Sequence, residues 1–388
     1  SIYDTRPVIQ EYKDLLLHTC NRLHKWPQFL EFGKDALTSG LLQSILYSLK
    51  DINSETTEMY IHKITNELFK PGNDQQLSDI FDEECSVRLL EASLVVAEPE
   101  TLYKIYEEFF MGKLMQLSLM PKTNFSVQRL LDHWTMKEEF EKVFGELSAG
   151  ISEVHRKCHT GILASLANAC LRLQTKQGAF VTELLKGYQC ETSERQNRVI
   201  ACIISLQTWE KLEDLKKEKG LYFSSCVHGS LIIEAILNFN KPIKLVNSLL
   251  ETNEDELIHL FNDQKGCHVV DAFMNSKYIG EKSREKLAKK LKERVCQYLS
   301  MYTRVTGLAI YIYSSALWKE IPFRHIPCAI LMKKNDDHGG SNFCSVRVML
   351  PHFGMYRQYS ESSDFPGNFA KTDYPTAERL DVVFMVNR

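Results

Sequence analysis

Seven short segments of this chain share one pattern whose polar residues are of types that bind nucleic-acid bases. Each segment has a polar or small pair, then two aliphatic residues, then in most cases a carboxylate or an amide. From the clearest to the most degenerate, the segments are 229–234, 266–271, 86–91, 127–132, 196–201, 38–43 and 159–164. A pattern that returns this often predicts one kind of surface, repeated along the chain.

The spacing within a segment has a simple consequence if the segment is helical. Residues four apart share a face, so Ser230 and Glu234 project together from their helix. Leu231 follows Ser230 by about 100° and lies at the edge of that face. Ile232 and Ile233 then turn inward and pack. We call the edge residue the flanking residue.

Such polar pairs, repeated on one surface, suit single-stranded nucleic acid. A polar pair can bond to a base edge, and a flanking Arg or His can stack on a base. Four of the seven flanking positions hold Arg or His. The residues that we predict to contact RNA are Arg88, Glu91, Gln128, Arg129, Asp132, Asn197, Arg198, Ser230, Leu231, Glu234, Cys267, His268 and Asp271.

The elements that position these residues are predicted to be helices. Apolar residues recur at three-to-four spacing up to about residue 300, and Pro or Gly breaks the segments. The seven segments follow one another at about 38 residues on average, a period typical of three-helix repeats. We therefore expect an all-α, curved α-solenoid over 1–300. We expect an irregular tail over 301–388, in which 346–350 and 380–386 are strands or unordered.

The segments 229–234 and 266–271 resemble repeats of the pumilio (PUF) family. That resemblance implies degenerate three-helix repeats, each contacting one RNA base through its second helix. It also implies that Ser230 with Glu234 faces guanine. Cys267 with Asp271 departs from the family's usual Cys/Gln pair.

Four further stretches resemble a nucleolar branch of the same family, over roughly residues 25–300. They are 35–43, 84–91, 109–115 and 124–132. This resemblance implies a nucleolar protein that binds precursor ribosomal RNA and delays its final cleavage during 18S rRNA processing. It also implies pre-ribosomal proteins as partners, and we expect a monomer.

Composition leaves a rival interpretation open. The chain has 388 residues with 47 Lys and Arg against 50 Asp and Glu, so its net charge of −3 does not itself indicate a nucleic-acid partner. Taken singly, each segment also fits an ordinary amphipathic helix. The alternative function is therefore an armadillo- or HEAT-type α-solenoid scaffold that binds proteins. The basic flanking residues favour RNA over this alternative.

Catalysis, cofactors and metals have little support. The sequence has no G-x-S-x-G motif, no phosphate-binding Gly-rich loop and no H-E-x-x-H motif. Its eleven cysteines are scattered, and none pairs at C-x-x-C spacing. The cluster His155–His159 has no second half at zinc spacing. We expect no enzyme, no cofactor, no metal site, no signal peptide and no membrane span.

Overall fold

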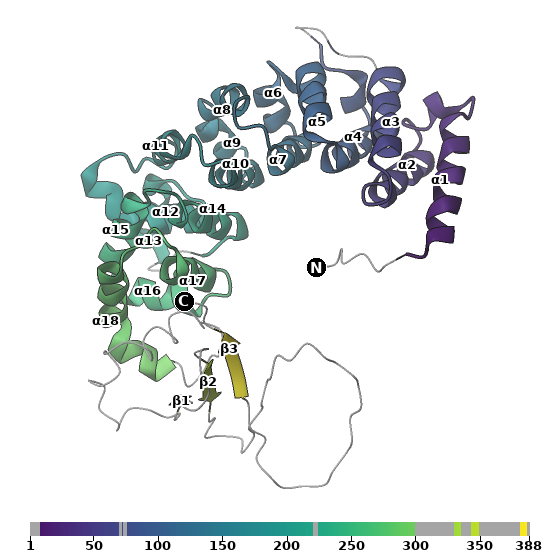
Figure 1. Cartoon of the computed structure of the whole chain (residues 1–388). Helices are drawn as coiled ribbons and strands as arrows, with labels where there is room; N and C mark the ends of the chain where they lie inside the picture. The colour runs from purple at the N-terminus through teal and green to yellow at the C-terminus, as the bar shows by residue number, and fades with distance from the viewer. Residues whose placement is uncertain are drawn as a thin grey trace. The chain divides into compact units, whose positions relative to one another are not determined.

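The computed structural model describes residues 8–69, 72, 76–219, 224–298, 330–334, 343–348 and 381–385 (Figure 1). Most of the described chain is helical. The α-helices are α1 (Gln10–His24), α2 (Ala36–Leu49), α3 (Ser54–Lys63), α4 (Glu84–Val96), α5 (Pro99–Ile105), α6 (Leu114–Leu119), α7 (Asn124–His133), α8 (Phe140–Ser148), α9 (Ile151–Arg156), α10 (Gly161–Arg172), α11 (Gln177–Gly187), α12 (Val199–Ser205), α13 (Trp209–Lys219), α14 (Val227–Leu237), α15 (Ile243–Glu251), α16 (Glu254–Asn262), α17 (Gly266–Asn275) and α18 (Glu281–Tyr298). The all-α prediction is confirmed for the described residues up to 298.

Five shorter helical segments complete this architecture. Three are 3-10 helices: η1 (Phe29–Glu31), η3 (Asp79–Phe81) and η5 (Ser193–Arg198). Two are single π-helical turns: η2 (Ile64–Leu68) and η4 (Tyr106–Phe110). Each π-helical turn directly continues an α-helix, α3 or α5.

Side chains at the helix starts explain several boundaries. Asp35 accepts hydrogen bonds from the backbone N–H groups of Leu37 and Thr38 at 3.1 and 3.0 Å, and so caps α2. Asn253 accepts from the N–H of Glu256 at 2.8 Å, and this bond starts α16. Such caps satisfy amide groups that have no partner within the helix.

The chain divides into two compact units. The first unit contains residues 1–252 and 276–279, and the second contains 253–275 and 280–388. In the first unit, α2, α4, α7, α10 and α14 pack successively, each against the next. We call these five helices the helical row. In Figure 1, α2, α4, α7 and α10 follow one side of the first unit, and α3, α5, α8 and α11 follow the other.

The core behind the row is apolar and aromatic. Tyr106 and Trp134 are buried and meet edge to face, with ring centroids 5.1 Å apart. The Arg172 guanidinium donates to the carbonyl oxygens of Leu131 at 2.7 Å and Trp134 at 2.8 Å. These bonds satisfy carbonyl groups at the end of α7 and tie α10 to that end.

The second unit holds α16, α17, α18 and three short strands. Asp263 accepts hydrogen bonds from the N–H groups of Lys265 and Gly266, each at 2.8 Å, at the start of α17. The strands β1 (Ile330–Lys334), β2 (Phe343–Val348) and β3 (Asp381–Met385) form an antiparallel sheet in that order. The register pairs Met332 with Val346 and Val346 with Val382. Two of these strands overlap the segments 346–350 and 380–386, which the sequence left open.

The predicted domain boundary at residue 300 lies outside the described residues. Among the described helices, none is both long and apolar enough to cross a lipid bilayer.

Candidate nucleic-acid interface

Five of the seven segments lie on helices of the row. Four of them keep both residues of the aliphatic pair inside, whereas in α2 Leu42 is buried and Leu41 is 47% exposed. Leu89 and Leu90 of α4, Leu130 and Leu131 of α7, and Ile232 and Ile233 of α14 have no exposed surface. The flanking residues Arg88 and Arg129 are exposed, and Leu231 is 39% exposed. The helix geometry that the sequence predicted is thus present at α4, α7 and α14.

The α4 position combines a charged pair with an aromatic ring. The Arg88 guanidinium donates to Glu91 Oε2 at 2.9 Å and lies 3.6 Å from the carboxylate of Glu84. It also lies 5.9 Å from the ring centroid of Phe125, at the start of α7. The hydrogen bond that Arg88 donates to Glu91, together with the negative charge of Glu91, raises the pKa of Arg88. The guanidinium is therefore held charged and oriented at the surface.

Glu91 lies inside the row. It is 6% exposed, and its second carboxylate oxygen accepts from Ser126 Oγ of α7 at 3.2 Å. The sequence predicted a carboxylate that faces a base edge at this position. The structure instead gives Glu91 the role of orienting Arg88 and joining α4 to α7, because both of its oxygens already have protein donors.

The α7 position offers polar groups at the surface. Gln128 is half-buried and donates to Asn124 Oδ1 at 3.0 Å, Arg129 is exposed, and Asp132 is half-buried. Gln128 lies across the start of α10, where a Cβ on Gly161 would stand 2.5 Å from Gln128 Oε1. Glycine at this position therefore allows the two helices to approach and the amide to lie between them.

The α14 position has the predicted polar pair. Ser230 Oγ donates to Glu234 Oε1 at 2.6 Å, so the two side chains share one face of the helix. Ser230 is buried and Glu234 is half-buried. A Cβ on Gly229 would lie 2.4 Å from the carbonyl oxygen of Ile203, so glycine also permits the close approach of α14 to α12.

The segments of α2 and α10 contribute less to the surface. In α2, Ser39 is buried, accepts from the Gln43 amide at 3.1 Å and donates to the carbonyl of Cys85 at 2.7 Å. In α10, residues 161–167 are all buried, and Thr160 Oγ1 lies 2.9 Å from His228 Nδ1. At both positions the polar side chains form hydrogen bonds to a neighbouring helix and are not available at the surface.

The segment 196–201 does not lie on the helical row, although the sequence pattern predicted that it would share one surface with the other segments. Asn197 and Arg198 lie in η5, and every residue of the following helix α12 is buried. Because α10 packs directly on α14, α12 lies outside the row. The Arg198 side chain is only 14% exposed and faces Glu213 at 3.6 Å. The prediction that Arg198 is an exposed flanking residue is wrong. Arg198 lies in η5 and not on the helix, and the helix that follows, α12, is buried on every side.

In the second unit, α17 carries the last segment. Val269 and Val270 are buried, His268 is exposed and Asp271 is half-buried. Cys267 is 5% exposed, and its burial, with the charges of Asp271 and Asp263, raises the pKa of its thiol. The thiol is therefore neutral, and His268 is the exposed group of this segment.

Phe125 is the surface residue that the sequence analysis did not single out. It is 49% exposed on the first turn of α7, one helical turn before Arg129. Its spacing in the sequence could have indicated this. Phe125 lies four residues before the flanking residue Arg129, and residues four apart share a face of a helix. Together, Arg88, Phe125 and Arg129 form a surface of two guanidinium groups and one ring. Such groups stack on bases and contact phosphates.

Relatives of this chain are found among nucleolar and pumilio proteins. Nucleolar protein 9 of Homo sapiens is 32% identical over 257 residues, which cover 62% of this chain and 40% of the human protein. Nucleolar protein 9 of Mus musculus is 32% identical over 225 residues, which cover 54% of this chain and 35% of the mouse protein. Pumilio homolog 23 of Arabidopsis thaliana is 26% identical over 200 residues, covering 48% and 25%. The chain thus spans less than half the length of these relatives.

Solved structures share the fold. The structure described as APUM23-GGAAUUGACGG has a TM-score of 0.63 and 18% identity, covering 79% of this chain and 60% of that one. Its variant that lacks an insert region has a TM-score of 0.66 and 19% identity, covering 76% and 58%. A sequence profile described as the NOP9-like PUF repeat domain matches residues 4–307. The helical row, the profile and the shared fold confirm the predicted resemblance, and the chain belongs to the NOP9-like PUF repeat family.

Proposed function

We propose that this chain binds single-stranded RNA along the helical row and does so without catalysis. The observation that carries the proposal is the surface of Arg88, Phe125 and Arg129 on the neighbouring helices α4 and α7. The two guanidinium groups supply positive charge for phosphates, and the ring supplies a stacking face that tolerates any base.

The chain would contact base edges with fewer than its seven repeated segments. Gln128 and Asp132 on α7, and Glu234 on α14, are only half-buried and are polar. In the second unit, His268 would stack on a base, and Cys267 and Asp271 lie beside it on the same helix. Because α10 presents no polar side chain from its segment and Glu91 is engaged, we infer weak sequence specificity. Affinity would come mainly from phosphates and stacking.

The cellular role follows from the named relatives. Because two of them are called Nucleolar protein 9, we infer a nucleolar protein. Its RNA would be precursor ribosomal RNA during 18S rRNA processing and ribosome biogenesis, with pre-ribosomal proteins as partners and the chain itself a monomer. The RNA sequence named with the APUM23 structure, GGAAUUGACGG, is a suitable first probe.

Fluorescence anisotropy of the whole chain tests this proposal. Labelled GGAAUUGACGG is titrated with protein across a salt series, beside the same RNA with its sequence reversed. We expect saturable binding whose log affinity falls linearly with log salt, by about 0.7 for each phosphate contact. Absence of binding at low salt would contradict the proposal and favour the protein scaffold.

A matched pair of variants locates the binding surface. Arg129→Ala removes a charge from the row, whereas Lys186→Ala removes one from α11, on the other side of the first unit. We expect the first to weaken binding and lower the salt slope, and the second to leave both unchanged. Equal effects of the two substitutions would contradict the assignment of the row.

A further inference from the structure

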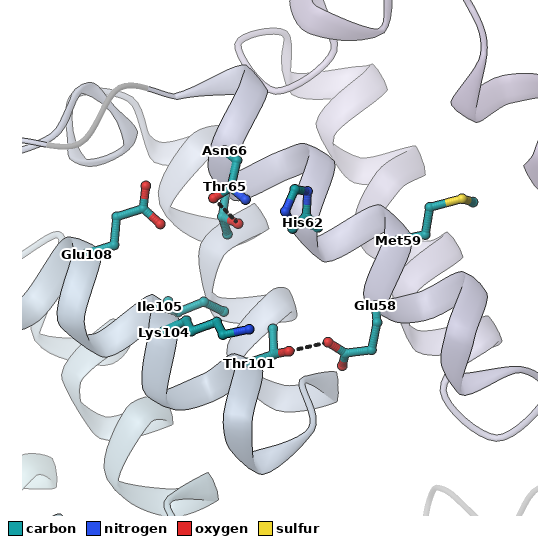
Figure 2. Close-up of a pocket in the computed structure, with 9 residues that line it drawn as sticks. All are labelled: Glu58, Met59, His62, Thr65, Asn66, Thr101, Lys104, Ile105 and Glu108. Atoms are coloured by element: carbon teal, nitrogen blue, oxygen red, sulfur yellow. Dashed lines mark hydrogen bonds between the residues drawn. The ribbon is translucent and has the colours of Figure 1, made fainter.

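A groove lies between α3–η2 and α5–η4 (Figure 2). In Figure 1, α3 and α5 lie on the side of the first unit away from the row. The groove is open to solvent and has a volume of about 370 Å³. We call it the outer groove. The two helices are joined at one end, where Glu58 of α3 accepts hydrogen bonds from the Thr101 hydroxyl and, at 2.9 Å, from the backbone N–H of Glu98.

Both helices that line the outer groove end in a π-helical turn. Such turns are rare and occur frequently at functional sites. The helices α8, α11 and α15, which follow α7, α10 and α14 in the same manner, have none over their described lengths. The π-helical turns are therefore a feature of this groove and not of every repeat.

The two ends of the outer groove differ in charge. Figure 2 shows the Lys104 side chain extending along the groove toward Thr101 and Glu58, and away from Glu108. The carboxylate of Glu58 thus has protein donors and a cation on its side of the groove. Glu108 stands at the other end, where no side chain or backbone group among the described residues donates a hydrogen bond to it.

Glu108 is a half-buried carboxylate that lacks full compensation. Within the described residues it has neither a hydrogen bond nor an ion pair. Burial raises its pKa above the usual value by more than the charge of His62 lowers it. A partly desolvated charge is unfavourable, so a donor or cation placed beside it gains stabilisation. Between the two ends, Ile105 supplies apolar surface, and Met59 lines the groove at the Glu58 end.

We propose that the outer groove docks a protein segment that places a lysine or arginine beside Glu108 and an aliphatic side chain over Ile105. Charge complementarity selects this occupant. RNA is disfavoured because a polyanion would meet the carboxylate of Glu108. A divalent metal is disfavoured because no described group of three or more His, Cys, Asp or Glu residues could hold one. The groove lies away from the row, so a partner docked there leaves the row free.

A labelled peptide tests the proposal on the whole chain. The probe is a fluorescein-labelled peptide of Gly-Leu-Arg repeats, and its control carries citrulline in place of arginine. We expect the arginine peptide to bind at least about tenfold more tightly, as one charge-assisted hydrogen bond provides. Equal binding of the two peptides, or no binding of the arginine peptide, would overturn the proposal.

Variants of the protein place that binding in the outer groove. Glu108→Gln should weaken arginine-peptide binding about tenfold, whereas Glu107→Gln, on the same turn but outside the groove lining, should leave it unchanged. Asn66→Lys, which adds a cation at the Glu108 end, should abolish it. Circular dichroism checks that each variant is folded. Binding that survives both Glu108→Gln and Asn66→Lys would overturn the proposal.

Saturation with GGAAUUGACGG separates this proposal from RNA binding at the row. We expect the arginine peptide to bind equally well with and without the RNA. Displacement of the peptide by RNA, or loss of RNA affinity in Glu108→Gln, would show that the groove binds nucleic acid and would overturn the proposal.

Discussion

The contact between α4 and α7 and the contact between α10 and α14 differ in how much of the repeated segment they leave exposed. At the first, Arg88, Phe125 and Arg129 reach the surface. At the second, residues 161–167 of α10 are buried and Thr160 contacts His228, so that only α14 keeps a flanking residue, Leu231, at the surface. The aliphatic pair determines which side of a helix packs, but the neighbouring helices decide whether the opposite side is exposed.

Gly229→Ala should produce the largest change, at the contact between α14 and α12. The added Cβ would lie within 2.4 Å of the Ile203 backbone oxygen, which cannot move as a side chain can. We expect a loss of about 3 kcal/mol in the free energy of unfolding, measured by urea denaturation. Gly145→Ala in α8 is the control, since its Cβ meets nothing within 4 Å, and it should stabilise by up to about 1 kcal/mol. Equal effects at the two sites would refute the close approach of α12 and α14.

Phe125→Ala and Arg198→Ala contrast the exposed and buried forms of the pattern. Loss of the Phe125 ring should weaken RNA binding by about 1–3 kcal/mol, the range for one stacked base. Arg198→Ala should leave RNA affinity unchanged, because that side chain faces Glu213 outside the row. Anisotropy with GGAAUUGACGG measures both. An RNA defect in Arg198→Ala that matches the defect in Phe125→Ala would restore the segment 196–201 to the interface.

Two histidines, the buried His155 and the half-buried His228, should make stability depend on pH. His155 lies 3.1 Å from the Leu206 carbonyl and packs on Tyr188, and burial lowers the pKa of His155 and of His228. As the pH falls below the ordinary value of 6.5, the unfolded chain binds these protons before the folded chain does. The free energy of unfolding should then fall by up to about 1.4 kcal/mol per pH unit for each histidine.

Urea denaturation between neutral pH and the folded-state pKa values checks this dependence. The variant His155→Gln should show a shallower slope of stability against pH than the unchanged chain. An identical slope would mean that His155 does not titrate differently on unfolding.

Glu234→Gln should give the smallest effect and should alter preference more than affinity. Glutamine can still accept the hydrogen bond from Ser230, so the face of α14 is kept while its charge is lost. We expect overall affinity to change by less than about 1 kcal/mol. Preference for guanine at one RNA position should fall, measured with single-base variants of the RNA. Unchanged preference would argue against a base contact at Glu234.

The sequence was sufficient to predict the helical repeats and the faces of most row helices. Ile232, Ile233, Leu130 and Leu131 are buried as their spacing required. This succeeded because helical periodicity depends only on local order along the chain.

The sequence was not sufficient where a contact joins distant segments. The burial of Glu91 depends on Ser126, 35 positions later, and the exclusion of Arg198 from the row depends on α10 packing against α14. The sequence of an aliphatic pair preceded by polar residues is the same whether neighbouring helices bury one side of its helix or all sides. The outer groove also escaped prediction, because the ends of α3 and α5 become neighbours only after the repeats stack.

The most direct test of the RNA interface is to find where RNA touches the chain. The measurement is photo-crosslinking of GGAAUUGACGG containing 5-iodouridine, followed by mass spectrometry of the linked peptides. We predict crosslinks within 124–133, at Phe125, and a second set at His268. Crosslinks confined to η5 and α12, or to the helices of the outer groove, would contradict the assignment of the helical row as the RNA-binding surface.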